Sequence, residues 1–117
     1  MPDSLDEIID QARELGRKIA AHPRTKDFLA AARAVAEDRQ AQDLLKTYQE
    51  AVNKIRTLQS AGKPIEPEDK RKVADAERGV AGDEKLKAMM KHQADYMELM
   101  QRVNGAIDQA SQSEGGS

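Results

Sequence analysis

Prolines and glycines are few in this chain, and their positions leave room for little besides helices. Of 117 residues, four are proline and seven are glycine. His22-Pro23 and Gly62-Lys63-Pro64 are strong interruptions, because the residue before a proline disfavours the helical conformation and glycine commonly ends a helix. The stretches between them carry apolar residues three and four positions apart, which is the spacing of one helical face. The sequence therefore predicts an all-α protein.

Five helices are expected from these interruptions and from residues that suit helix starts. Asp38 and Asp83 can each accept a hydrogen bond from a free backbone N–H of a first turn, and Thr25 is a third candidate cap. Pro67 suits a first helical position. The expected helices run from Asp3 or Ser4 to about Ala21, from Thr25 to about Ala36, from Asp38 to about Ala61, from Pro67 to the glycines at 79 and 82, and from Asp83 to about Ala110. We expect an antiparallel helical bundle that forms one domain over residues 1–110, two of its helices being long, and a flexible C-terminal tail over residues 111–117.

A tightly spaced apolar stripe follows the helix start at Asp38. Its members are Ala41, Leu44, Leu45 and Tyr48. They fall at the i, i+3, i+4 and i+7 positions of one helical face, so this face needs another helix beside it. In the first helix, Gly16 lies within the apolar stripe and would permit close approach by a neighbour; a weak spot in an ordinary helix is an equal alternative.

The last expected helix carries a wider apolar arc, which covers about half of its circumference. Such width suggests two neighbours, one in the same chain and one in a second subunit. A buried helix inside a monomeric bundle would leave the same pattern, but we expect a homo-oligomer with coiled-coil-like helix pairing. Flexible methionines suit a surface that binds more than one partner, and two polar residues within the arc could fix the helix register. The expected interface comprises Leu86, Met89, Met90, Gln93, Tyr96, Met97, Met100, Val103 and Asn104.

Composition excludes several kinds of site. The chain has no cysteine, so its own thiols cannot form disulfides, act as nucleophiles or hold zinc or iron-sulfur clusters. Its N-terminus is acidic where a signal peptide would be basic and apolar, and no uncharged run approaches the about 20 residues that span a bilayer. We therefore expect a soluble cytoplasmic protein without membrane insertion.

Candidate reactive residues are better explained by helix structure. His22 precedes Pro23 at an expected helix end, and His92 has only Asp95 and Glu98 near it on one face, fewer ligands than a metal usually needs. Acidic pairs such as Glu37-Asp38 lie at helix starts, where the helix dipole favours negative charge. We expect no catalytic residue, no metal ligand and no bound cofactor; a metal- or ligand-dependent enzyme site between subunits is the competing hypothesis.

The compact basic run Lys70-Arg71-Lys72 is preceded by Glu66, Glu68 and Asp69. The net charge of the chain is −2, which does not favour binding to phosphate backbones. A solvated helix surface explains the run, and a nucleic-acid accessory protein that binds through residues 70–72 is the alternative function.

The order and length of these pieces resemble the YlbF/YmcA family of small helical bacterial proteins. The likeness covers nearly the whole chain, including Gly62–Pro67 and the capped helix at Asp83. The residues that match the family's central helix are Asp38, Ala41, Gln42, Leu44, Leu45, Tyr48 and Gln49, and those similar to its closing helix are Leu86, Ala88 and Gln93.

The resemblance implies an all-helical fold, a homo-oligomer that is commonly a dimer, and no enzymatic activity. Characterised relatives are cytoplasmic regulators that join proteins of the same kind in a complex influencing RNA turnover and, through it, competence, sporulation and biofilm formation. Some members of that assembly are associated with iron-sulfur clusters. This cysteine-free chain departs from that pattern, which leaves the adaptor role as the expectation: a regulator that self-associates and binds protein partners through apolar helical surfaces.

Overall fold

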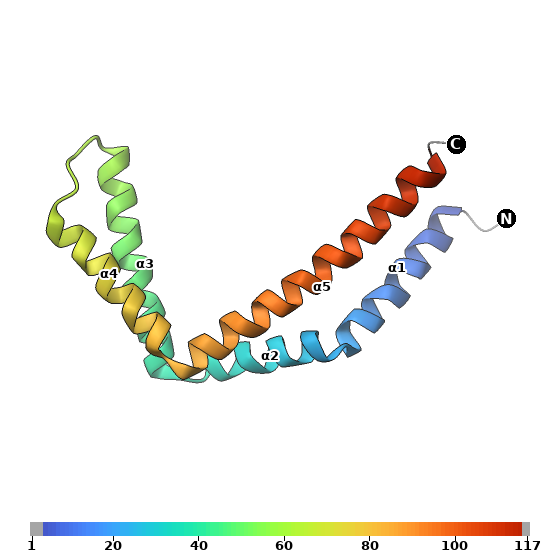
Figure 1. Ribbon diagram of the computed structural model, residues 1–117, viewed down its shortest axis with the longest axis horizontal. Coiled ribbons are helices and arrows are strands. Elements are labelled where there is room, and N and C mark those ends of the chain that lie inside the picture. Colours follow the sequence, from blue (N-terminus) through green and yellow to red (C-terminus); the bar gives the residue numbers. More distant parts are fainter. Residues whose placement is uncertain (1–3, 116–117) are drawn as a thin grey trace. The chain divides into compact units, whose positions relative to one another are not determined.

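The computed structural model describes residues 4–115, and within that part the chain forms five α-helices and no strand (Figure 1). The helices are α1 (Ser4–Ala21), α2 (Pro23–Ala36), α3 (Arg39–Ser60), α4 (Pro67–Gly82) and α5 (Glu84–Gly115). The all-α prediction and the two long helices, α3 and α5, are confirmed.

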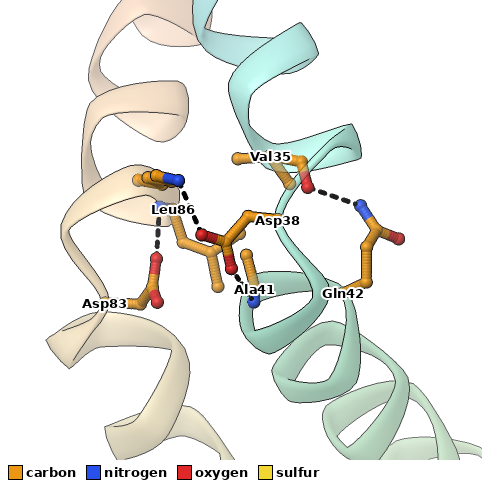
Figure 2. Close-up of polar contacts among 7 residues, drawn as sticks. Val35, Asp38, Ala41, Gln42, Asp83 and Leu86 are labelled. Carbon is orange, nitrogen blue, oxygen red and sulfur yellow. Dashed lines mark hydrogen bonds and ion pairs between the residues drawn. The ribbon is translucent and has the colours of Figure 1, made fainter.

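Aspartates start α3 and α5 as the sequence predicts. Asp38 Oδ1 accepts a hydrogen bond from the N–H of Ala41 at 2.8 Å, and Asp83 Oδ1 accepts one from the N–H of Leu86 at 2.9 Å (Figure 2). Each carboxylate satisfies a first-turn N–H that has no partner inside its helix. At the other end of α3, Gly62 has a φ of 68°, a left-handed conformation that glycine adopts without steric cost.

Two expected helix bounds are corrected. α2 begins at Pro23, so Thr25 is not its cap; His22 serves that end, its Nδ1 accepting from the N–H of Arg24 and its carbonyl from the N–H of Thr25 and Lys26. α5 continues to Gly115, past the expected end at Ala110. Residues 111–114 include neither glycine nor proline, so nothing local stops the helix there. Residues 116 and 117 of the predicted tail lie outside the described residues.

The helices form two compact units. The first comprises residues 1–30 and 92–117, of which the described parts are α1, the first half of α2 and most of α5; the second comprises residues 31–91. The expectation of one domain over residues 1–110 stays a prediction.

The core of the second unit lies where α2 gives way to α3 and α4 gives way to α5. Leu86 and Ala41 are fully buried and Val35 almost so. Figure 2 shows this corner, in which Gln42 Nε2 also donates to the carbonyl of Val35 at 3.0 Å. Leu44, Leu45, Val80 and Met89 surround these three buried residues. The apolar stripe of α3 therefore packs as the sequence predicts.

α3 and α4 form a hairpin in this unit, lying side by side in Figure 1. They approach closely at Gly79, where an added Cβ would lie 3.0 Å from Leu44 Cδ2. A larger residue at position 79 would require the Leu44 side chain to shift, so glycine here suits the close packing.

In the first unit, the start of α2 is held to α5 by few contacts. The Phe28 and Tyr96 rings stack with centroids 5.3 Å apart. Arg24 donates to the carbonyl of Asp95 at 3.2 Å and lies 3.7 Å from the Glu98 carboxylate. Thr25 is buried, and its hydroxyl has no hydrogen-bond partner among the described residues. Within α1 itself no side chain is buried.

Replacing Leu86 by alanine tests the corner core. The substitution leaves a cavity between α2, α3 and α5, and we expect it to lower the free energy of unfolding by about 2–5 kcal/mol. Urea denaturation followed by circular dichroism measures the loss. Met90→Ala, at an exposed position of the same helix, is the control and should change the midpoint little. Equal midpoints for the two variants would contradict a core centred on Leu86.

Candidate protein-interaction surface

The first unit exposes large apolar side chains that a monomeric protein usually buries. Ile8 in α1 is 63% exposed, and in α5 Met97 is 52% and Ile107 50% exposed. Leu5 and Ile9 of α1 are exposed as well. Contiguous exposed apolar surface commonly marks a place where another molecule binds. We call this surface, formed by Ile8, Ile9, Met97, Ile107 and the groove described next, the open face.

A shallow groove lies within the open face between α1 and α5. It has a volume of about 330 Å³ and is lined by Leu15, Val103, Ala106, Ile107 and Ala110. All five lining residues are apolar. Leu15 and Val103 are half-buried, so the two helices only partly cover each other. A side chain or helix from another molecule would complete this packing.

The structure divides the interface that the sequence predicts on α5. Leu86 is fully buried against Val35 and Ala41 and so belongs to the core, not to a surface open to a partner. Met89 also packs against that core, whereas Met90 is exposed. These three lie in the second unit.

The remaining predicted interface residues lie in the first unit. Gln93, Met97 and Asn104 are exposed, while Tyr96, Met100 and Val103 are half-buried. Tyr96 is occupied by its stacking contact with Phe28. The part of the prediction that remains open to a partner is thus centred on Met97 and Val103.

Sequence reasoning did not assign α1 to the site. Its apolar stripe is as regular as that of α3, and the spacing alone does not distinguish a helix that is covered from one that is left open. After Ala110, α5 continues as Ser111, Gln112 and Ser113, which are polar and do not extend its apolar stripe.

Ion pairs join helices within the second unit. Lys54 Nζ lies 2.8 Å from the Asp69 carboxylate, which is 6% exposed and also accepts from the N–H of Glu66. The ammonium of Lys54, followed by the Glu66 N–H, lowers the pKa of Asp69, and Asp69 raises the pKa of Lys54. This pair joins α3 to α4 near the loop that connects them.

At the corner, Lys85 Nζ lies 2.6 Å from Asp38 Oδ2. Lys85, followed by the Ala41 N–H, lowers the pKa of Asp38, and Asp38 in turn raises the pKa of Lys85. The ion pair thus joins the cap of α3 to the first turn of α5. Gln42 and Gln49, the other polar residues of the family pattern, are exposed.

The candidate reactive groups are not brought together. Within the described residues, no three histidine, cysteine or acidic side chains converge as a metal site would require. In the basic run, Arg71 forms an ion pair with Glu68, and the charge of Lys72 helps to lower the pKa of Asp69. No described helix is long and apolar enough to cross a membrane.

The fold and the open face define an all-helical protein with an uncovered apolar helix surface. Residues 8–110 match the family described as control of competence regulator ComK, YlbF/YmcA. The chain therefore belongs to the YlbF/YmcA family, as its sequence pattern indicates.

Two relatives show how far the likeness extends. A UPF0342 protein of Desulfitobacterium hafniense (strain Y51) is 24% identical over 104 residues, covering 89% of this chain and 79% of that protein. The fold is similar to that of RicA from Bacillus subtilis, solved in complex with RicF, with a TM-score of 0.81 and 17% identity; the match covers 95% of this chain and 97% of RicA.

Acid should weaken the hairpin through its buried carboxylate. Folding lowers the pKa of Asp69, so at low pH the unfolded chain binds a proton at this carboxylate more readily than the folded chain does. The contribution of ionised Asp69 to the free energy of unfolding is therefore fully present above the ordinary carboxyl pKa of about 4. It is lost as the pH falls through the lower pKa of the folded state. We expect the urea midpoint to fall between about pH 5 and pH 3, and to fall less in Asp69→Asn. Asp108→Asn, at an exposed position, should titrate like the wild type. Identical acid limbs for all three proteins would contradict this role of Asp69.

Proposed function

We propose that this protein is a non-enzymatic regulatory adaptor that self-associates and binds protein partners through the open face. The observation that carries the proposal is the exposure of Ile8, Met97 and Ile107 on two helices of one unit. Burying such side chains contributes about 1.5–3 kcal/mol each, enough for a few of them to support association. The membership of the chain in the YlbF/YmcA family supports a regulatory role.

A protein partner fits this surface better than a small molecule does. The open face extends along both helices, and its groove is shallow and lined by apolar residues alone, with no polar group to orient a ligand. RicA, whose fold this chain shares, was solved in complex with another protein, RicF. By analogy, a helix of a partner would lie along α1 and α5 and cover the exposed side chains.

Self-association and a cytoplasmic location are parts of the same proposal. A second copy of the chain carries the same apolar face, so two copies can cover each other. The family resemblance implies cytoplasmic regulators acting on RNA turnover, and we propose that the adaptor serves a regulatory assembly of that kind.

A charge placed on the open face tests the proposal. Met97→Glu and Val103→Glu would bury an unpaired carboxylate in the interface, so each should raise the Kd of association at least tenfold without loss of helicity. Light scattering over micromolar concentrations measures self-association, and affinity capture from the native cell measures partner binding. Met90→Glu makes the same change at an exposed position of the second unit and should have little effect. Wild-type association and capture in both open-face variants would remove this surface from the function.

A further inference from the structure

One edge of α1 lies beside the line of residues that faces the groove, and this edge is exposed throughout. At about 100° per residue, it follows a different line from the half-buried Leu15 and Ile19. The residues along this edge are Leu5, Ile9, Ala12, Gly16 and Ala20. We call it the outer edge of α1. All five residues are apolar and lie at exposed positions.

Side-chain size changes in one direction along the outer edge. Large residues lie in the first half, where Ile9 is 40% exposed, and small ones lie in the second half. At Gly16 an added Cβ would meet no atom within 4 Å, so the space above this glycine is empty within the chain. A large side chain from another molecule could lie there.

Charge changes in the same direction on one flank of this edge. Asp6 and Asp10 lie on that flank in the first half of α1, and Arg13 and Arg17 lie on it in the second half. Arg13 bonds Asp10 at 3.2 Å and Arg17 bonds Glu14 at 2.8 Å, whereas Asp6 forms no ion pair within the described part of the chain. Acid before base also suits the helix dipole, but the dipole does not require both charges to share one flank.

We propose that the partner on this edge is a second copy of the chain, with the two α1 helices antiparallel and their two-fold axis near Ala12. Ile9 and Gly16 lie three and four residues on either side of Ala12, so Ile9 then lies over the partner subunit's Gly16. Asp6 and Arg17 lie six and five residues on either side, so Asp6 meets the partner subunit's Arg17. A parallel pair would instead place large residues against large ones, and it would put the charged flanks of the two helices on opposite sides of the pair.

The antiparallel arrangement satisfies the symmetry of a homodimer. In a two-fold interface, if one residue contacts another across it, the reverse contact also forms. Here the same pairing fills the space above both glycines and supplies both Asp6 carboxylates with a guanidinium. The inference rests on the self-association in the proposed function and adds the helix and the direction of pairing.

Disulfide mapping tests the direction of pairing, and the absence of native cysteine makes it clean. Ile9→Cys and Gly16→Cys, each alone, should give little cross-linked dimer on mild oxidation, while a mixture of the two should cross-link readily because the new thiols meet across the axis. Glu14→Cys, on the opposite side of α1, is the control and should not cross-link in any mixture.

Three results would overturn the inference. Efficient cross-linking of each variant with itself would show a parallel pair. A dimer by light scattering that cross-links in no combination would show that α1 is not at its centre. A strict monomer would contradict self-association itself as well as this pairing of α1. Capture of a partner protein through the open face would then show that the adaptor role remains although the pairing of α1 does not.

Gly16→Leu provides a second readout that does not depend on disulfides. An added Cβ at this position has no neighbour within 4 Å in the described chain, and leucine replaces a poor helix former. Helicity should therefore be kept or raised, while the Kd of self-association rises at least tenfold. Adding Ile9→Ala should restore part of the association by exchanging the large and small positions. Gly82→Leu, at an open glycine of α4, is the matched control. Unchanged association in Gly16→Leu would contradict close pairing at this edge.

Discussion

The burial of Leu86 against Val35 and Ala41 is the interaction on which the second unit depends. It lies at two helix junctions, where α2 meets α3 and α4 meets α5. Two aspartates satisfy free backbone N–H groups around it: Asp38 caps α3 and Asp83 caps α5. Lys85 of α5 forms an ion pair with Asp38 and so links the cap of α3 to α5. With the aromatic residues few, this corner and the Lys54–Asp69 pair hold the hairpin through small, close contacts rather than through a large core.

The first unit lacks such a centre. α1 has no buried side chain, and the contacts of α5 with the start of α2 are the Phe28–Tyr96 stack and the bonds of Arg24. Most of the stability of a helix in a protein comes from packing of its apolar face, so the apolar stripe of α1 has to be covered for this helix to be firmly stable. The stability of this unit and its proposed binding function therefore draw on the same surface.

Much of the fold could be predicted from the sequence because its signals are local. Asp38, Asp83, Pro67 and Gly62 each act within one turn of the chain, and all four mark helix bounds as expected. Thr25 was misassigned because Pro23 can itself begin a helix and His22 supplies the cap.

The candidate site was predicted less well because burial depends on contacts between distant segments. Leu86 and Met97 share one helix and similar periodicity, yet one is enclosed at the corner and the other is 52% exposed. Only the positions of α2 and α3 around Leu86 distinguish them. The outer edge of α1 could be read as a stripe, but its spacing alone does not show that it is left exposed.

Hydrogen exchange of the α1 amides, measured against protein concentration, tests most directly whether the open face is covered by association. The account predicts weak protection of α1 in dilute solution and protection that rises with concentration, while the amides around Leu86 exchange slowly throughout. Protection of α1 that is strong in dilute protein and independent of concentration would contradict it, because α1 would then be stable without a partner.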